Sequence, residues 1–457
     1  MRTSIMFMLR QFHVLCILFA ACMVPVTTEN AVSPLTLEKA VRMALERHPD
    51  ILISQEETNE LLGKIKEVRS GAFPQVSFQG FGLRLRDPSI LNSSSFDNVP
   101  QEFRDALIPK PNNMFDMGLR VKQPLYTAGK VGTALHLAEV SLEETETNAE
   151  SIRRQLTFMV FQAFHNLLLA EANSDVIRET HAQRQKHLEL ARIRYENGVA
   201  TEVDVLRSEV NVANIEPEII RADNRVRLAR SELNNLIVVD LETPTEIVGD
   251  LEYLPWDAGS LEAIQEQTLV QRPSIKTMQN QLQQARLTLA LAQAENKLSV
   301  DLEGQVGYAV REPQNFFNND FSKWSITFNF NLPLFDSGRK SGLVMQARAR
   351  VRAAEYRLEK YENDVRLEVK QAYDDMQSSE KAIHAARLSV SQAEKVLEMM
   401  EANYQYGAAT TLDVMDSQTT LAAARNEEIG AIYEYEMAKA RLRLASGSPI
   451  LEQEVNR

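Results

Sequence analysis

Residues 324–332 read Trp324-Ser-Ile-Thr-Phe-Asn-Phe-Asn-Leu332 and alternate strictly between apolar and polar side chains. Successive side chains of an extended strand point to opposite faces, so this stretch has one apolar and one polar face. Three other stretches alternate similarly, and two of them carry charges on the polar face. Their length of about 9–11 residues suits a tilted membrane strand. The pattern predicts four strands of a membrane barrel, at about 74–86, 114–124, 298–310 and 322–333; a soluble sandwich is the alternative.

Four strands are too few for a barrel made by one chain. They cannot enclose a lumen, and an open sheet edge in lipid would leave backbone groups without hydrogen-bond partners. Bacterial barrels begin at about 8 strands, so two or more chains must share one barrel, and three chains would supply about twelve strands.

The segment after the fourth strand predicts a very long helix. Residues 339–404 contain one glycine and no proline, and their apolar or small residues recur at alternating spacings of four and three. This is the spacing of a coiled-coil seam. A helix of ~65 residues is ~100 Å long and must pair with other helices. We therefore predict helical hairpins over 337–446, turning at Gly407, and over 128–238, with a kink at Pro217.

The sequence contains an internal two-fold repeat. Tyr195 aligns with Tyr404 at an offset of 209 that holds without a gap over much of each half, and an earlier block repeats at an offset of 224. The offsets differ by 15, which places a longer loop in the first half between 82 and 124. We predict that this loop faces outside the cell. We also predict two equivalent repeats, 31–246 and 247–457, each with one strand pair and one helical hairpin.

The N-terminus has the organisation of a secretory signal peptide. Arginines precede an apolar run over 12–26, which polar residues follow. We predict a signal peptide over 1–30; a transmembrane anchor is the alternative, although the run is shorter than the ~20 residues a span requires. The only cysteines are Cys16 and Cys22, so the mature chain would have no disulfide. Acylation of Cys22 is the other alternative.

Composition and motifs exclude several classes of function. The net charge of -13 argues against a nucleic-acid partner, because phosphate binding needs a basic face. His181 and His187 are six residues apart, which does not place them on one helical face, so no metal pair follows. Phosphate-loop, nucleophile-elbow and zinc-protease patterns are missing from the sequence. We predict no enzymatic activity, no cofactor and no metal.

Both halves carry the same motifs where the long helix ends and where it begins. They are Tyr195-Glu-Asn-Gly198 with Thr201-Glu-Val-Asp204, Tyr404-Gln-Tyr-Gly407 with Thr410-Thr-Leu-Asp413, Pro124-Leu-Tyr-x-x-Gly129 and Pro333-Leu-Phe-x-x-Gly338. Over about residues 35–447, the chain resembles the TolC-like outer-membrane efflux protein family. The resemblance implies a mixed α and β membrane protein and a homotrimer. A twelve-stranded barrel in outer-membrane lipid would continue as a helical tunnel into the periplasm.

The resemblance also implies a function. The chain would be the passive exit duct of a tripartite efflux or export system. A periplasmic adaptor and an inner-membrane pump of RND, ABC or MFS type would deliver drugs, metals or proteins to it. The outer-membrane component of a type I protein secretion system is one alternative. A periplasmic coiled-coil scaffold without a pore is the other.

The residues at the predicted hairpin turns have two interpretations. Asp413 and Asp416 are three apart, hence on one helical face. Threefold symmetry would make them carboxylate rings that attract cations. However, Asp413 also fits a capping box with Thr410, as does Asp204 with Thr201, and such a box needs only local helix-start chemistry. Asp416 has no acidic counterpart in the first half, where Arg207 stands.

The remaining tip residues are expected to shape the turn and meet the adaptor. Gly198 and Gly407 stand where long helices reverse, and glycine relieves the steric cost of positive φ there. Tyr404 ends the seam, as core or as a latch between helices, and Tyr195 is its counterpart. In the family a basic residue that helps to lock the closed tip often stands two positions after the second glycine. This chain has Ala409 there.

Overall fold

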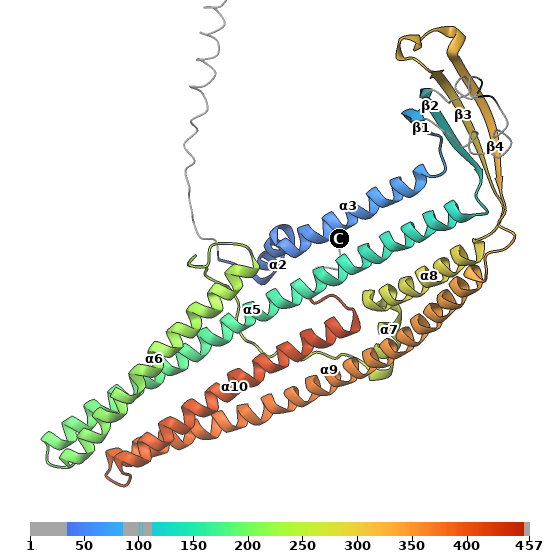
Figure 1. The fold of residues 1–457 in the computed structure, drawn as a ribbon. Helices are drawn as coiled ribbons and strands as arrows, with labels where there is room; N and C mark the ends of the chain where they lie inside the picture. Colours follow the sequence, from blue (N-terminus) through green and yellow to red (C-terminus); the bar gives the residue numbers. More distant parts are fainter. Residues whose placement is uncertain (1–33, 86–99, 101–102, 104–111, 452–457) are drawn as a thin grey trace, which may run out of the picture.

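The computed structural model describes residues 34–85, 100, 103 and 112–451. The predicted signal peptide, Cys22 and most of the longer first-half loop lie outside these residues. The described elements follow in the same order twice: two short helices, two strands and a helical hairpin (Figure 1). They are α2 (Leu37–Arg47), α3 (Pro49–Ser70), β1 (Gln75–Leu85), β2 (Asn112–Tyr126), α5 (Lys130–Glu196) and α6 (Glu202–Leu236), then α7 (Leu261–Gln271), α8 (Pro273–Ala294), β3 (Ser299–Val310), β4 (Ser322–Asn331), α9 (Arg339–Gln405) and α10 (Thr411–Ser446).

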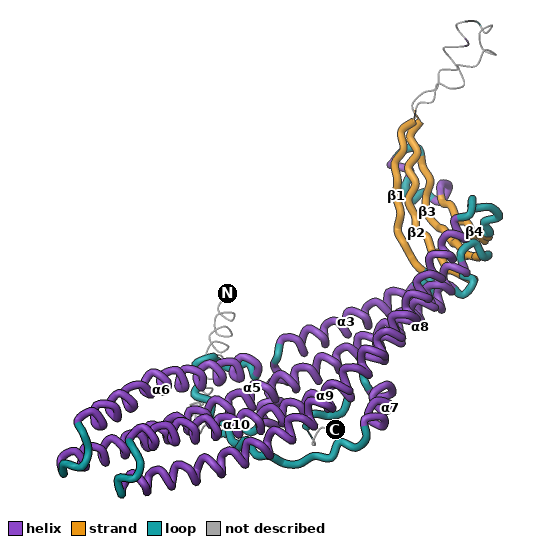
Figure 2. Tube along the Cα trace, turned by 90° about the horizontal axis from the view of Figure 1, so that it is seen from below, coloured by secondary structure: helices purple, strands orange, loops and turns teal. Residues whose placement is uncertain are grey.

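The predicted long helical hairpins and four strands are confirmed. Helices α5 and α9 have 67 residues each, whereas their return helices α6 and α10 have 35 and 36. The return helices therefore cover about half of each long helix, at 1.5 Å per residue. The other half packs against the 22-residue helices α3 and α8. Figures 1 and 2 show the resulting shape, with the sheet at one end and both hairpin turns together at the other.

The short helices α2, α3, α7 and α8 were not predicted, although the sequence contains their start signals. Thr36 and Ser260 are N-caps whose hydroxyls accept backbone amides. Pro49 and Pro273 then begin the next helix at its first position, where a missing N–H costs nothing. Pro217, in contrast, does not interrupt α6, which continues from Glu202 to Leu236. It lies on an exposed side of the helix, where water can satisfy the carbonyl that it leaves unpaired.

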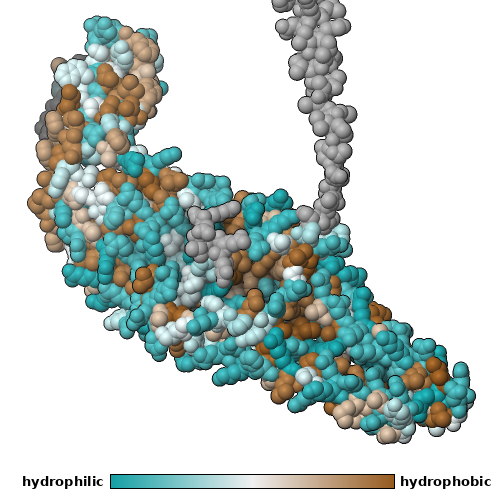
Figure 3. All heavy atoms as spheres, turned by 180° about the vertical axis from the view of Figure 1, so that it is seen from behind, coloured by the Kyte–Doolittle hydropathy of each residue, from teal (hydrophilic) through white to brown (hydrophobic). Residues whose placement is uncertain are grey.

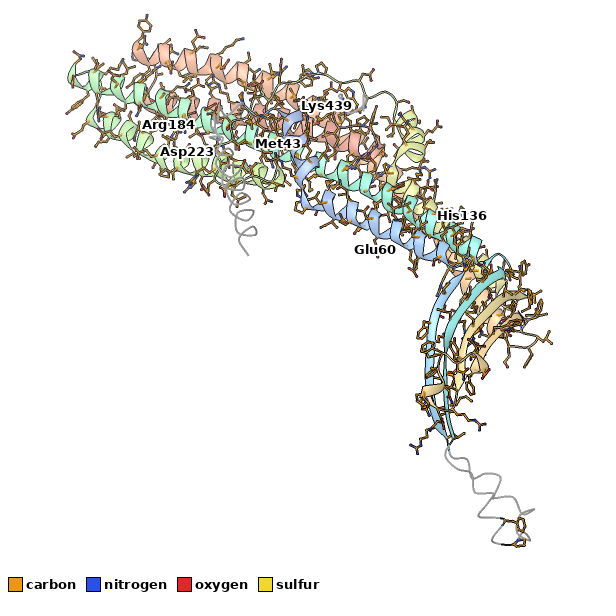
Figure 4. The ribbon with its side chains drawn as sticks, turned by 90° about the horizontal axis from the view of Figure 1, so that it is seen from above. Met43, Glu60, His136, Arg184, Asp223 and Lys439 are labelled. Atoms are coloured by element: carbon orange, nitrogen blue, oxygen red, sulfur yellow. The ribbon has the colours of Figure 1, made fainter. Side chains whose placement is uncertain are left out.

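The core runs along the seam of each hairpin. Apolar residues of α2, α5 and α6 form one cluster around Phe164 and Leu167, and residues of α9 and α10 form another around Tyr435. The segment between the two halves wraps around this second cluster, where the Trp256 amide donates to the Tyr435 hydroxyl at 3.0 Å. Polar contacts add to the seam, and Figure 4 labels two of their residues. Arg184 of α5 donates a hydrogen bond to the Asn211 carbonyl of α6. Asp223 of α6 forms an ion pair with Arg178 of α5.

The four strands form one antiparallel sheet in the order β1-β2-β3-β4. Strands β1 and β4 are the edges, and each pairs with one neighbour only. Over the central part of the sheet, the pairing aligns apolar residues with apolar residues. One complete row consists of Phe78, Leu119, Val306 and Trp324. The alternation seen in each strand therefore becomes a property of the sheet, which has one apolar and one polar face.

Candidate functional site

The apolar face of the sheet is exposed. Along β4 it presents Trp324, Ile326 and Phe328, which are 77%, 65% and 58% exposed. Figure 3 shows hydrophobic side chains gathered over this end of the molecule. Soluble monomers rarely expose a continuous apolar patch of this kind, and such patches mark interfaces with membranes or proteins.

The polar face of the sheet carries matched charges. Arg120 of β2 pairs with Glu303 of β3 at 3.0 Å, and Lys122 of β2 lies 3.6 Å from Asp301 of β3. Each pair brings together one acid and one base. The face is therefore hydrophilic, and these pairs add no net charge to it.

A third ion pair on this face spans three strands. Lys323 of β4 reaches across β3 to Asp116 of β2. Between them Gly118 and Gly307 stand opposite each other. A Cβ on Gly118 would come within 2.5 Å of the Val306 carbonyl oxygen, and one on Gly307 would collide with the backbone of β2. The glycines therefore allow close strand approach and leave open the path of the Lys323 side chain.

The junctions between strands and long helices are alike in both halves. Ala128-Gly129 and Ser337-Gly338 each place two consecutive residues at positive φ just before the helix. Of the predicted junction prolines, Pro124 lies inside β2 beside a shift in strand register, whereas Pro333 follows β4. Glu295 links the two junctions by pairing with Lys130 of α5 and with Arg339 of α9. Lys130 is the main cause that holds the pKa of Glu295 below its usual value.

At the opposite end both hairpin turns have the same backbone structure. Gly198 and Gly407 have φ of 74° and 76°, and the residue after each donates its amide to the carbonyl five positions earlier. This is the Schellman arrangement, which favours glycine at the left-handed position. Because the next helix then starts at once, each turn brings a helix end and a helix start together.

Capping boxes begin both return helices. Asp413 accepts the Thr410 amide at 2.8 Å and the Thr410 hydroxyl at 2.7 Å, and Asp204 accepts the same groups of Thr201 at 3.0 and 2.7 Å. The threonine hydroxyl is the largest cause that lowers the pKa of each aspartate, with the amide second. Both carboxylates therefore serve the local helix start, as the second interpretation expects.

Asp416 lies one turn further along α10. With Asp413 it lines an open groove of about 440 Å³ between α9 and α10. Unlike Asp413 it stands outside the capping box. The structure of the single chain thus brings the two acids together in one groove.

Tyr404 and Tyr195 have different surroundings, although they are counterparts in the repeat. Tyr195 is 46% exposed, whereas Tyr404 is 4% exposed. The Tyr404 hydroxyl lies 3.2 Å from the Thr411 hydroxyl of α10, and its ring lies 4.9 Å from that of His187 on α5. Thr411 also contributes to the lowered pKa of Asp204 on α6. Helices from both hairpins therefore meet at Tyr404.

Two residues of this cluster were missed by sequence reasoning. His187 is buried, its Nε2 atom has no hydrogen-bond partner, and burial lowers the pKa of its imidazole. Arg194 of α5 lies over the Tyr404 ring and bonds to the end of α9. A signal existed: His187, Ala191 and Arg194 recur at the spacing of one helical face, which leads directly into the tyrosine motif.

Two statements hold for the described residues, which are 34–85, 100, 103 and 112–451. No helix there is both long and apolar enough to cross a membrane. Within the same residues, no group of three or more His, Cys, Asp or Glu side chains is placed to hold a metal ion.

Long helical hairpins joined to a sheet with one exposed apolar face and one charged face define a class of channel-forming membrane proteins. The sequence profile of the family described as "Outer membrane efflux protein" matches residues 40–237 and 264–448. The chain belongs to this family, so it is a TolC-like channel protein of the outer membrane.

Individual relatives agree with this assignment. The chain is 22% identical over 433 residues to outer membrane protein TolC of Vibrio cholerae, with 94% of each chain covered. It is 23% identical over 318 residues to the alkaline protease secretion protein AprF of Pseudomonas aeruginosa, covering 68% of this chain and 65% of that one. The structure of the CmeC outer membrane channel of Campylobacter jejuni superposes with a TM-score of 0.76 at 18% identity, covering 90% of this chain and 85% of the other.

Proposed function

We propose that three copies of the chain form one outer-membrane duct, with a shared twelve-stranded barrel and a helical tunnel that extends into the periplasm. The main support for this proposal is the four-stranded sheet, whose apolar face is exposed and whose two edge strands each have one free edge. Lipid cannot satisfy the backbone groups of an open edge. Because β1 and β4 run in opposite directions, β4 of one copy can pair antiparallel with β1 of the next, and the ring then closes without an edge.

The proposed duct is passive and performs no catalysis. Its helical tips would receive a periplasmic adaptor, and an inner-membrane pump of RND, ABC or MFS type would supply the energy. Likeness to TolC supports an exit duct for efflux or export. Likeness to AprF, which is named for protease secretion, keeps the type I secretion duct as the second candidate. The exposed apolar sheet face opposes a periplasmic scaffold without a pore.

Cross-linking tests the shared barrel. In a background with Cys16 and Cys22 replaced by Ala, we place one cysteine on β4 by Thr327→Cys and scan β1 with Gln75→Cys, Ser77→Cys and Gln79→Cys. All four positions lie on the polar face. At least one β1–β4 combination is expected to oxidise into covalent dimers and trimers on denaturing gels, with three chains as the upper limit, because each copy would lie beside two others.

The matched control links strands within one chain. Gln305 and Ser325 are direct partners in β3 and β4, so Gln305→Cys with Ser325→Cys should give an internal bond and migrate as a monomer. A ladder that continues past three chains would contradict the trimer. Monomers at every β1 position would contradict the shared barrel.

We also propose that Asp416 forms a cation-attracting ring at the tip of the tunnel, with Asp413 beside it. Asp416→Asn tests this more cleanly than a change at Asp413, because Asp413 also caps its helix. The variant is expected to lower the preference for cations in bilayer recordings, as seen in the reversal potential under a salt gradient. Asp250→Asn, which removes one exposed charge from the segment between the halves, should leave selectivity unchanged. Unaltered selectivity in Asp416→Asn would refute the ring.

A further inference from the structure

Four helices form one layer beside the sheet, and the two outer helices each have a free side. In the order α3, α5, α8, α9, each helix packs against the next, and Figure 1 shows α3 and α9 at opposite edges of the layer. Helix α3 leads into β1, and α9 follows β4. If β4 of one copy pairs with β1 of the next, the free side of α9 must therefore meet the free side of α3 in that next copy.

The chain contains a counterpart of this contact within itself. Through the repeat, α9 corresponds to α5 at the offset of 209, and α8 corresponds to α3 at the offset of 224. The contact of α5 with α8 is therefore equivalent to a contact of α9 with α3 of another copy. Within the chain, Lys276 of α8 pairs with Glu143 of α5 at 2.8 Å. Gln281 and Gln284 of α8 donate to the carboxylate of Glu144. The long helix thus supplies acids, and the short helix supplies donors.

Burial differs between the two long helices where a neighbour is missing. Val140 and Thr147 lie two turns apart on α5, and both are buried. Their counterparts on α9, Ala349 and Tyr356, are exposed, and Tyr356 is 69% exposed. Helix α5 lies between α3 and α8, whereas α9 lies at the edge beyond α8. The exposed side of α9 is therefore the side that a neighbouring copy would cover.

The charges at this contact are reversed between the two halves. Arg352 of α9 corresponds to Glu143 of α5. Glu57 and Glu60 of α3 correspond to the two glutamines of α8. The lysine of α8 has Leu52 as its counterpart, so that position holds no charge that would repel an arginine. Between copies, the long helix would supply the base and the short helix the acids.

These charges have no partner within one copy. Arg352, Glu57 and Glu60 are exposed, and in the part of the chain that the structure describes none of their side chains forms an ion pair or a hydrogen bond. Figure 4 labels Glu60 on α3. The same holds for three further arginines within about two turns of Arg352, which are Arg348, Arg350 and Arg357. This stretch of α9 is therefore basic, and it is complementary to the acids that α3 presents.

We propose that Arg352 of α9 pairs with Glu57 and Glu60 of α3 in the next copy, so that a charge-matched seam joins each copy to its neighbour. The proposal rests on the proposed function as a shared duct, and it identifies the side chains that align the copies. Charge pairs across an interface contribute more to register and partner choice than to raw affinity. The free side of α3 attracts the bases of α9 and repels a long helix that carries the acids of α5. The seam therefore also discriminates against joining the copies in the wrong order.

Charge reversal in the detergent-solubilised full-length protein tests the seam. Arg352→Glu, and separately Glu57→Lys with Glu60→Lys, are each expected to shift the balance between trimers and monomers at least about tenfold toward monomers, which corresponds to ~1.4 kcal/mol. The two changes move the net charge of a copy in opposite directions, so overall charge cannot explain a common loss. Combining all three substitutions should restore the balance to within about twofold of the wild type, because the pair is then present in inverted form.

Salt and an unrelated charge reversal supply the controls. Added salt screens charges, so it should weaken the wild-type trimer and strengthen that of Arg352→Glu, in which like charges face each other. Glu262→Lys, at an exposed position of α7, should leave the balance unchanged. Trimers of Arg352→Glu as stable as the wild type, or a combined variant no more stable than the separate reversals, would overturn the seam and leave the duct in place. A monomeric wild type without β1–β4 cross-links would refute the duct and the seam together.

Discussion

Tyr404→Ala is expected to separate the two hairpin turns at the tip, whereas Tyr195→Ala is expected to leave them packed together. The two tyrosines are counterparts in the repeat, but only Tyr404 is buried, at 4% exposure. Truncating a buried aromatic residue to alanine typically costs ~3–5 kcal/mol. Here the change would also remove the ring beneath Arg194 and the hydrogen bond between the Tyr404 and Thr411 hydroxyls.

The measurements are single-channel conductance and the rate at which a protease cleaves the turn after α9. Both should rise sharply in Tyr404→Ala and stay at the wild-type level in Tyr195→Ala. Tyr404→Phe separates packing from hydrogen bonding. It keeps the ring and loses only the hydroxyl, which typically contributes ~0.5–1.5 kcal/mol, so a small effect is expected. A closed, protease-resistant Tyr404→Ala protein would show that this cluster does not hold the tip.

The elements that could be predicted from the sequence are those whose signal is local. The alternation at 324–332 and the four–three spacing over 339–404 each lie within one element, and both predicted the correct structure. The capping boxes at Thr201 and Thr410 are equally local, because they need only a threonine and an aspartate three residues apart.

The contacts at the tip could not be predicted in the same way. Arg194 and Tyr404 are far apart in sequence, and their meeting depends on how two hairpins pack side by side. The pairing of Lys323 with Asp116 likewise requires the register of three strands and the glycines between them. The repeat even argues against such contacts, because it suggests equal roles for Tyr195 and Tyr404. The structure shows that the second half uses its tyrosine as core and the first does not.

A lysine on the apolar face of the sheet is expected to prevent assembly of the barrel, whereas a lysine on the polar face should be tolerated. Ile326 and Thr327 are neighbours in β4 that point to opposite faces, and both are exposed in the single chain. A lysine that faces lipid near the middle of the bilayer costs ~2–4 kcal/mol, and a trimer would contain three of them. Ile326→Lys should therefore abolish the oligomer recovered from outer-membrane fractions, and Thr327→Lys should retain it. Equal recovery of the two variants would contradict the assignment of the faces.

Ile326→Trp then distinguishes a lipid-facing surface from one that packs against protein. Against another sheet, the larger ring would overpack a close-packed interior, at a typical cost of ~1–3 kcal/mol. Against fluid lipid it meets no fixed neighbours, and the strand already presents Trp324 on the same face. Recovery of Ile326→Trp at the wild-type level, together with loss of Ile326→Lys, is the pattern that only a lipid-facing barrel predicts. Loss of both variants would instead favour the soluble sandwich, because a close-packed interior is destabilised by the larger tryptophan as well as by the charged lysine.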